Sequence, residues 1–201
     1  CSSESQNTDS VKLALNNSAK ISYRGSNSLI KYRLKAFTNK DPNYIKNLLG
    51  VEKDKRVIFY ASDPSKEESQ RYLVEMFLMK YFSNNQDHVL VIKTHTQDDG
   101  KITHYSYLDA KRPENIFLIG DETQKGKLVS DEFHIFEAFD FNNAISSSDG
   151  FLTSSSSSIL QALVLGVKTG IVDKFNNGYY DYLIKYDASS LINDKKSLDS
   201  Y

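Results

Sequence analysis

Four short stretches of this chain are apolar, without the alternating polar residues of a strand that has one wet face. They are RVIFYAS (Arg56–Ser62), HVLVIKTH (His88–His95), NIFLIGD (Asn115–Asp121) and GFLT (Gly150–Thr153). Such strands are typical of parallel sheets, because helices cover both faces of those sheets. Between the strands lies enough chain for the crossover helices that parallel pairing requires. The pattern therefore predicts an α/β fold with a doubly wound, mostly parallel sheet and helices on both faces.

Helical patterns lie around these strands. The clearest is in Asp63–Phe82, where an early proline and acidic first turns precede apolar residues at helical spacing. Pro42–Leu49 is predicted to be a helix with Asp41 as its N-cap and Gly50 as its stop. The weaker patterns predict a strand at Lys20–Gly25, a helix or irregular turn at Lys101–Lys111, a helix at Phe133–Asn143, a strand within Val167–Phe175, and a strand or turn followed by a short helix at the carboxyl end.

The run GFLTSSSSSILQALVLG (Gly150–Gly166) places five serines between a strand and an apolar helix pattern. The first N–H groups of a helix lack intrahelical partners and carry partial positive charge, so a strand turning into a helix through small polar residues suits an anion. A single serine as an N-cap is the simpler reading. Five serines exceed what a cap requires, which favours an anion site.

The carboxyl ends of parallel strands meet at one edge of the sheet, and ligands of doubly wound folds bind there. The residues expected at this edge are small or polar: Gly25–Ser26, Ser62–Asp63, Lys93–Thr96, Gly120–Asp121 and Thr153–Ser158. Solvated loops also carry polar residues where nothing binds. The serine run together with His95 favours one ligand-binding crevice.

Composition narrows the class of protein. The chain has 201 residues and a formal net charge of −1, with 39% hydrophobic residues. It is long enough for one domain with a real core, which we place at residues 20–201 after a polar lead-in at 1–19. The near-neutral charge argues against nucleic acid as a partner and against electrostatic membrane attachment. No apolar run reaches the roughly 18–20 residues of a membrane span.

Cys1 is the single cysteine, so an internal disulfide is impossible and a reducing, cytoplasmic compartment is expected. Because the chain starts with cysteine rather than methionine, we expect it to be a processed or partial chain. The start CSSESQNTDS is also typical of a mature bacterial lipoprotein, anchored at the envelope through Cys1. The preceding residues would decide between these readings.

Four segments in order resemble the carboxyl-terminal, nucleotide-sugar-binding half of GT-B-type bacterial glycosyltransferases for capsule and surface polysaccharides. They are YRGSNSLIKYRL, GVEKDKRVIFYAS, VLVIKTHTQDD and SDGFLTSSSSSILQALVLGVKTGIV, within residues 20–175. The groups most similar are the polysialyltransferase-like and CDP-glycerol glycerophosphotransferase-like enzymes. The resemblance implies a Rossmann-like domain that binds a nucleotide-sugar donor, needs no metal or other cofactor, and lies in the cytoplasm or peripherally at the inner membrane.

The resemblance also assigns roles to residues. His95 takes the place of the family's strand-end histidine, and Ser156 and Ser157 take the place of its paired serines, all of which contact the donor phosphates or nucleotide. Ser155 belongs to the same loop. Gly25 and Ser26 fall where the family's first glycine loop approaches the donor. Gln161 stands where many members have an acidic residue for the ribose hydroxyls, and an amide can still bind a hydroxyl.

The resemblance places the catalytic base and the site for a saccharide or lipid-linked acceptor in a preceding amino-terminal domain. The chain is then the donor half of a glycosyltransferase, and no catalytic residue can be named in it. Two alternatives stay open: a sugar-nucleotide epimerase, and a non-catalytic envelope lipoprotein with a Rossmann-like domain. An epimerase is expected to carry more carboxylates in the pocket.

Other polar and aromatic residues are expected to have structural roles. Lys93 is expected to snorkel or to pair with an acid. His134, Glu137 and Asp140 are expected on a solvated helix face rather than in a metal site. Four tyrosines near the carboxyl end suit packing in the core and rim better than stacking on a base or sugar: Tyr179, Tyr180, Tyr182 and Tyr186.

Overall fold

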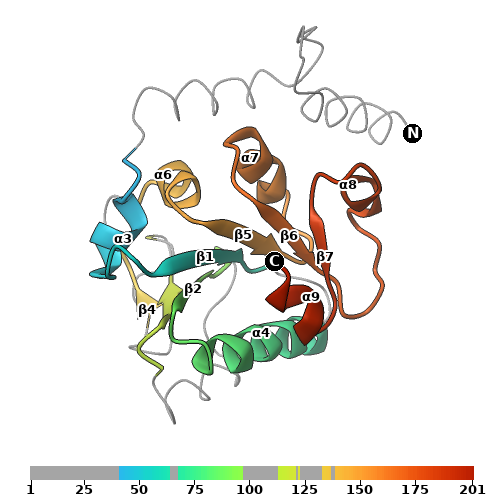
Figure 1. The fold of residues 1–201 in the computed structure, drawn as a ribbon, viewed down its shortest axis with the longest axis horizontal. Coiled ribbons are helices and arrows are strands. Elements are labelled where there is room, and N and C mark those ends of the chain that lie inside the picture. The colour runs from blue at the N-terminus through green and yellow to red at the C-terminus, as the bar shows by residue number, and fades with distance from the viewer. Residues whose placement is uncertain (1–40, 64–67, 97–112, 121, 123–132, 137–138) are drawn as a thin grey trace, which may run out of the picture.

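The computed structural model of the chain describes residues 41–63, 68–96, 113–120, 122, 133–136 and 139–201 (Figure 1). Its strands form one sheet in the order β4-β3-β2-β1-β5-β6-β7, and every neighbouring pair is parallel. The strands are β1 (Arg56–Ala61), β2 (His88–Lys93), β3 (Ile116–Ile119), β4 (Phe133–His134), β5 (Gly150–Thr153), β6 (Thr169–Val172) and β7 (Ser190–Ile192). The predicted doubly wound, Rossmann-like α/β sheet is confirmed.

Helices cover both faces of this sheet. In Figure 1, α3, α6, α7 and α8 lie on one side of the strands, and α4 and α9 lie on the other. The helices are α3 (Tyr44–Leu49), α4 (Glu68–Ser83), α6 (Phe141–Ser146), α7 (Ser158–Val164), α8 (Asp181–Lys185) and α9 (Lys195–Asp199). This layering explains why the strand sequences are apolar at successive positions, since neither face meets water.

Residues of β1 show how one strand serves two cores. Ile58 and Tyr60 pack on the face that carries α4 and α9, together with Leu78 of α4. Val57 and Phe59 point to the opposite face and pack against α3, α6 and α7. All of these side chains are almost fully buried. Burial contributes roughly 1.5–3 kcal/mol for each large apolar side chain, so the two cores hold the strand rigidly between them.

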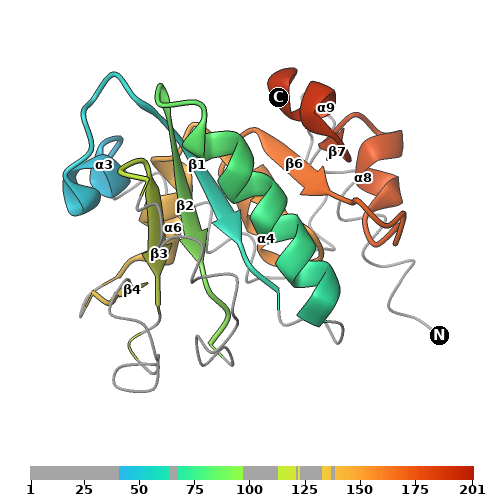
Figure 2. The same cartoon turned by 90° about the horizontal axis from the view of Figure 1, so that it is seen from below.

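The chain reverses its winding between β1 and β5. From β1 the strands advance through β2 and β3 to one edge, and from β5 they advance through β6 and β7 to the other. The strands β1, β2 and β3 point the same way in Figure 2. After β1 the chain runs to α4, and after β5 it runs to α7 on the opposite face. In doubly wound folds, ligands bind beside the carboxyl ends of the strands at such a reversal, which here lies between β1 and β5.

The helix predicted at Phe133–Asn143 is wrong. Phe133–His134 forms the edge strand β4, where the His134 carbonyl accepts a hydrogen bond from Gly120 N at 3.1 Å. The helix α6 begins only at Phe141, because the Asp140 carboxylate accepts from the backbone N–H groups of the first helical turn. The aromatic residues stack on one another instead of forming a helical stripe: Phe117, His134, Phe136 and Phe139.

Two helix ends differ from the prediction. The residue before α3 is Asn43, and Asp41 instead accepts a hydrogen bond from Asn43 N at 2.9 Å, which closes the preceding turn. Gly50 ends the helix as predicted, with φ of 67°. At the carboxyl end, α8 precedes the expected strand and short helix. The strand predicted at 20–25, the segment 101–111 and the lead-in 1–19 lie outside the described residues.

Candidate functional site

A cavity of about 480 Å³ lies at the carboxyl ends of β1 and β2 and the start of α7. We call it the switch-point cavity, because it adjoins the place where the sheet reverses its winding. Its walls come from five places in the sequence: Ala61 and Ser62, Lys93 to Thr96, Glu122, three phenylalanines (Phe136, Phe139 and Phe141), and Ser156 to Ser158 with Gln161. The topology thus brings together segments that are almost 100 residues apart in the chain.

The switch-point cavity unites most of the residues that the sequence singles out. His95, Ser156, Ser157 and Gln161 all line it, so the predicted meeting of the histidine and the serine run at one edge is confirmed. Their role in binding stays a prediction. Ser155 lines a neighbouring hollow instead. Gly25 and Ser26 lie outside the described residues.

The serine run is held by a small set of hydrogen bonds. Ser156 N donates to Thr153 Oγ1 at 3.0 Å, and Ser158 N donates to Ser156 Oγ at 3.4 Å. The Ser156 hydroxyl therefore accepts from the first backbone N–H group of α7. Ser154 Oγ lies 3.4 Å from Tyr60 Oη, and the Ser155 carbonyl accepts from Tyr180 Oη at 2.9 Å.

Ser157 is the most accessible serine of the run for a ligand. It is exposed at the start of α7, and within the described part of the chain its side chain makes no capping hydrogen bond. Since α7 has seven residues, its dipole adds little. An anion at this wall would therefore be bound mainly by the hydroxyl and amide donors around the cavity.

Lys93 supplies a cation to the switch-point cavity. It ends β2 and is only 8% exposed, and its ammonium donates to the Thr94 carbonyl at 2.8 Å, among other contacts. A buried ammonium is costly unless negative or polar groups surround it. A phosphate in the cavity would lower that cost. In the sequence, this cation is a lysine at the carboxyl end of an otherwise apolar strand, a pattern that also predicts a snorkelling side chain or a pair with an acid.

His95 lies close to a carboxylate on the neighbouring strand end. Burial raises the pKa of Asp63, and the charges of His95 and Arg71 oppose that rise. The Asp63 side chain lines the neighbouring hollow, whereas His95 lines the switch-point cavity. An imidazole N–H can bond a phosphate oxygen.

Gln161 lines the cavity and carries an unsatisfied acceptor beneath the cavity surface. Its Oε1 atom is buried, and within the described part of the chain it has no hydrogen-bond partner. Buried polar atoms in folded proteins are nearly always paired, so this oxygen calls for a donor from a ligand or water. A sugar or ribose hydroxyl is such a donor.

Aromatic rings form another part of the cavity wall. The rings of Phe136 and Phe139 have centroids 6.3 Å apart at an interplanar angle of 22°, and both line the switch-point cavity. Phe141 packs edge-on against Phe59 of the core, with centroids 5.8 Å apart, which anchors this wall. Partly exposed rings suit a flat ligand group such as a base. The apolar spacing of Phe133–Asn143 predicts a helix, so the sequence alone does not indicate this wall.

A buried carboxylate supports the floor of the cavity. Glu75 of α4 is fully buried, and its Oε1 accepts a hydrogen bond from Ser62 Oγ at 2.5 Å. Ser62 follows β1 directly and lines the cavity. A charge-assisted bond of this kind holds the strand end in one position, so the ligand-facing backbone at Ser62 is preorganised.

Within the residues that the structure describes, no three histidine, cysteine or carboxylate side chains come together as a metal site would need. Glu137, which the sequence places between His134 and Asp140, lies outside the described residues. Among the described helices, none is both long and apolar enough to cross a membrane.

No protein-family model matches this chain, and no curated protein sequence matches it either. Solved structures with a similar fold include a UDP-N-acetylglucosamine 2-epimerase from Methanocaldococcus jannaschii in complex with UDP-GlcNAc and UDP, at 14% identity and a TM-score of 0.47, covering 86% of this chain and 43% of that one. Another is the β-Kdo 2,7-transferase KpsC of Thermosulfurimonas dismutans, at 13% identity and a TM-score of 0.35, covering 82% and 45%. This chain spans less than half the length of either protein.

Proposed function

We propose that this chain binds the nucleotide-sugar donor of a glycosyltransferase that builds a bacterial capsule or surface polysaccharide. One observation carries the proposal: Lys93, His95, the serine run and Gln161 line one cavity at the point where the sheet reverses its winding. Doubly wound folds bind their ligands at this point. The motif order that resembles GT-B-type enzymes points the same way.

The phosphates of the donor fit the wall formed by β2 and α7. Lys93 contributes a positive charge there, His95 an imidazole N–H, and Ser157 an exposed hydroxyl. Hydrogen bonds from charged or hydroxyl donors to an anion are among the stronger polar contacts in proteins. Because Lys93 is buried, its charge is poorly screened by salt and acts strongly on a nearby phosphate.

The nucleoside fits the rest of the cavity. The stacked rings of Phe136 and Phe139 offer a surface for the base. The unsatisfied Gln161 oxygen and the exposed Glu122 carboxylate offer acceptors for hydroxyl groups of the ribose or the sugar. The cavity volume of about 480 Å³ is within the usual range for a small-molecule site.

In sugar transfer, the acceptor oxygen forms a bond to the anomeric carbon while the bond from that carbon to the nucleotide phosphate breaks. Negative charge then develops on the departing phosphate. In this proposal Lys93, His95 and the serine donors stabilise that charge, which is the usual way a site of this kind accelerates transfer. The base that takes the acceptor proton is proposed to come from another domain.

The two alternatives differ in what they require. A sugar-nucleotide epimerase needs carboxylates or other acid–base groups at the sugar, whereas Glu122 is the single carboxylate among the described residues that line the switch-point cavity. A non-catalytic lipoprotein needs no nucleotide site at all. The lipoprotein alternative therefore fails if a nucleotide binds tightly and specifically.

Thermal-shift measurements test the proposal with three nucleotides and a sugar conjugate of each: UDP and UDP-N-acetylglucosamine, CDP and CDP-glucose, CMP and CMP-N-acetylneuraminic acid. A ligand present at 100 times its Kd stabilises the folded state by about 2.7 kcal/mol, which gives a measurable rise in Tm. His95→Ala should reduce the shift. His88→Ala is the matched control, because His88 begins β2, the strand whose far end leads to His95. Equal shifts in both variants, or no shift with any compound, would overturn the proposal.

A further inference from the structure

A second, smaller hollow lies beside the switch-point cavity, on the side of the sheet that carries α4. We call it the aromatic hollow, after two rings at its mouth, Phe175 and Tyr179; its polar walls include Asp63, Gln70, Arg71 and Ser154. Its enclosed volume is about 30 Å³. That is room for a water molecule or a hydroxyl group, but not for a whole ring. A ligand would therefore rest on the rings at the mouth and place one polar group inside.

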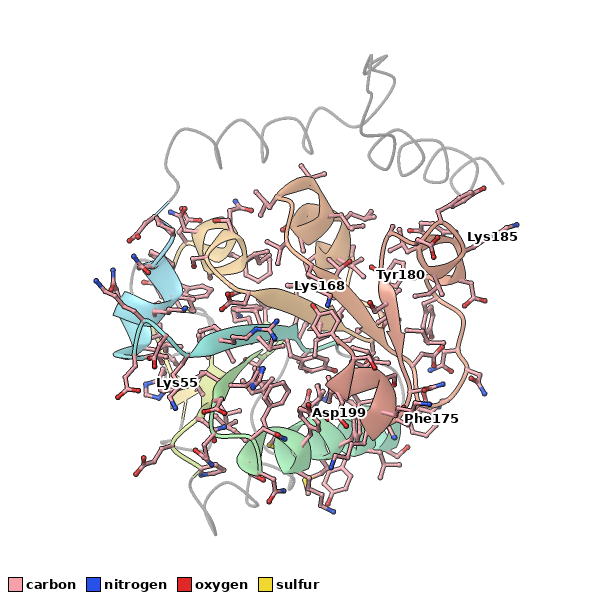
Figure 3. All side chains as sticks on the ribbon, viewed as in Figure 1. Lys55, Lys168, Phe175, Tyr180, Lys185 and Asp199 are labelled. Atoms are coloured by element: carbon pink, nitrogen blue, oxygen red, sulfur yellow. The ribbon has the colours of Figure 1, made fainter. Side chains whose placement is uncertain are left out.

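The two rings at the mouth are unusually accessible. Tyr179 is 63% exposed and Phe175 is 37% exposed. Both belong to the loop between β6 and α8, and Figure 3 labels Phe175. Exposed rings beside a polar hollow offer a flat apolar face to a ligand while its polar groups find partners next to it.

The loop that carries the rings is already ordered for binding. The Asp173 carboxylate accepts hydrogen bonds from the backbone N–H groups of Phe175, Asn177 and Gly178, at 3.2, 2.9 and 3.0 Å. The Asn177 side chain donates to Gln70 Oε1 of α4 at 3.1 Å, which ties the loop to the far wall. A ligand that binds here has little loop entropy to remove.

The polar walls favour hydroxyl groups over phosphate. Asp63 contributes a carboxylate, Gln70 an amide and Arg71 a largely buried guanidinium. Planar groups of these kinds form paired hydrogen bonds with adjacent hydroxyls, and the Asp63 carboxylate offsets the attraction of the Arg71 guanidinium for a phosphate. The switch-point cavity has the opposite character at its phosphate wall, with Lys93 and His95. The two spaces therefore suit two different parts of a substrate.

The serine run forms the wall between the two spaces. Ser154 and Ser155 line the aromatic hollow, whereas Ser156 to Ser158 line the switch-point cavity. Tyr180, the residue after the exposed Tyr179, donates through its hydroxyl to the Ser155 carbonyl at 2.9 Å. One rigid segment thus joins both sites, and a ligand group bound in one lies next to the other.

We propose that the aromatic hollow binds a pyranose ring, which stacks on Tyr179 and directs a hydroxyl toward Asp63 and Gln70. The inference rests on the proposed function only for the source of the sugar, which is either the donor sugar or an acceptor saccharide. The shared chemistry is an apolar sugar face against a ring and a hydroxyl against planar polar groups. Both sources require Tyr179 to be exposed as it is.

Isothermal titration of the full chain with UDP and with UDP-N-acetylglucosamine, beside an array of immobilised oligosaccharides, tests this inference. Tyr179→Ala removes the ring, Tyr179→Phe keeps it, and Tyr186→Ala is the control at another exposed tyrosine outside the hollow. For a donor sugar, Tyr179→Ala weakens UDP-N-acetylglucosamine by about tenfold and leaves UDP unchanged, as expected for loss of an aromatic contact. For an acceptor saccharide, it removes binding to the array and leaves both nucleotides unchanged.

The outcomes separate this inference from the proposed function. Binding of an oligosaccharide that depends on Tyr179, without binding of any nucleotide, would support the saccharide site and overturn the donor-binding function. If a nucleotide binds but Tyr179→Ala changes the binding of neither UDP-N-acetylglucosamine nor any oligosaccharide, the saccharide site alone is overturned. Tyr179→Phe should behave like the native chain, and an equal loss in Tyr186→Ala would overturn the assignment of the ring.

Discussion

The hydroxyl oxygens of Ser156 and Ser158 lie 2.6 Å apart at the first turn of α7. Together with the bond from Ser158 N to Ser156 Oγ, this pair closes the start of the helix. Ser157 lies between them and is exposed. Adjacent serines of one run therefore have different roles: Ser156 stabilises the start of the helix, and Ser157 is accessible to a ligand.

This division makes the effects of single serine substitutions predictable. Ser156→Ala should lower the free energy of unfolding by roughly 0.5–2 kcal/mol, as for loss of an N-cap. Ser157→Ala should leave it unchanged. The double variant should weaken binding of the best nucleotide by at least about tenfold, since ~1.4 kcal/mol is a factor of ten. Urea denaturation and calorimetric titration measure the two quantities. Ser154→Ala, whose hydroxyl faces the other hollow, is the matched control and should bind as the native chain does.

Lys93→Met should weaken both stability and binding. A methionine fills similar volume but leaves the Thr94 carbonyl without this buried donor, so the free energy of unfolding should fall. Nucleotide affinity should fall at least about tenfold because the phosphate loses a poorly screened cation. Urea denaturation measures the free energy of unfolding, and calorimetric titration of the same sample measures the nucleotide affinity. A variant that unfolds easily but binds normally would show that Lys93 is structural only.

Asp63 predicts a pH dependence of stability. Burial raises its pKa above the ordinary value of 3.8, although the nearby charges of His95 and Arg71 oppose this. Between those two pKa values the folded chain holds more protons than the unfolded chain, so the free energy of unfolding falls as pH rises. The advantage of Asp63→Asn over the native chain should therefore grow as pH rises above 3.8 and then level off. Urea denaturation across this range measures it, and an advantage that shrinks with rising pH would contradict the prediction.

Tyr201 should be important for stability but not for binding. Its buried hydroxyl accepts from Phe151 N at 2.9 Å and donates to the Lys168 carbonyl at 2.7 Å, at the edge of the sheet opposite the cavity. Tyr201→Phe removes this partner from two backbone groups that stay hydrogen-bonded to each other, which should cost roughly 0.5–1.5 kcal/mol in the free energy of unfolding. The exposed Tyr186→Phe serves as the control in denaturation experiments. Nucleotide affinity should be the same in both variants, and a selective loss in Tyr201→Phe would contradict the separation of the two edges.

The parallel sheet and the serine run could be predicted because their signals are local. Apolar runs such as His88–Lys93 show burial on both faces whatever surrounds them, and glycine at position 50 marks a helix end by its own backbone freedom. The alternation of strands and helices then leaves few topologies open, and the rules for parallel crossovers select the doubly wound one. His95 and the serines could be placed at one edge for the same reason.

Only the tertiary structure decided which side chains share a space. The segment Phe133–Asn143 has apolar spacing that suits a helix, but pairing of Phe133–His134 with β3 and stacking among the aromatic rings prevail over it. The burial of Lys93, the unsatisfied oxygen of Gln161 and the split of the serine run between two hollows depend on what packs opposite each residue. Local sequence determines the preference of a segment for strand, helix or cap, whereas burial and partnership arise from contacts between distant segments, which no local pattern records.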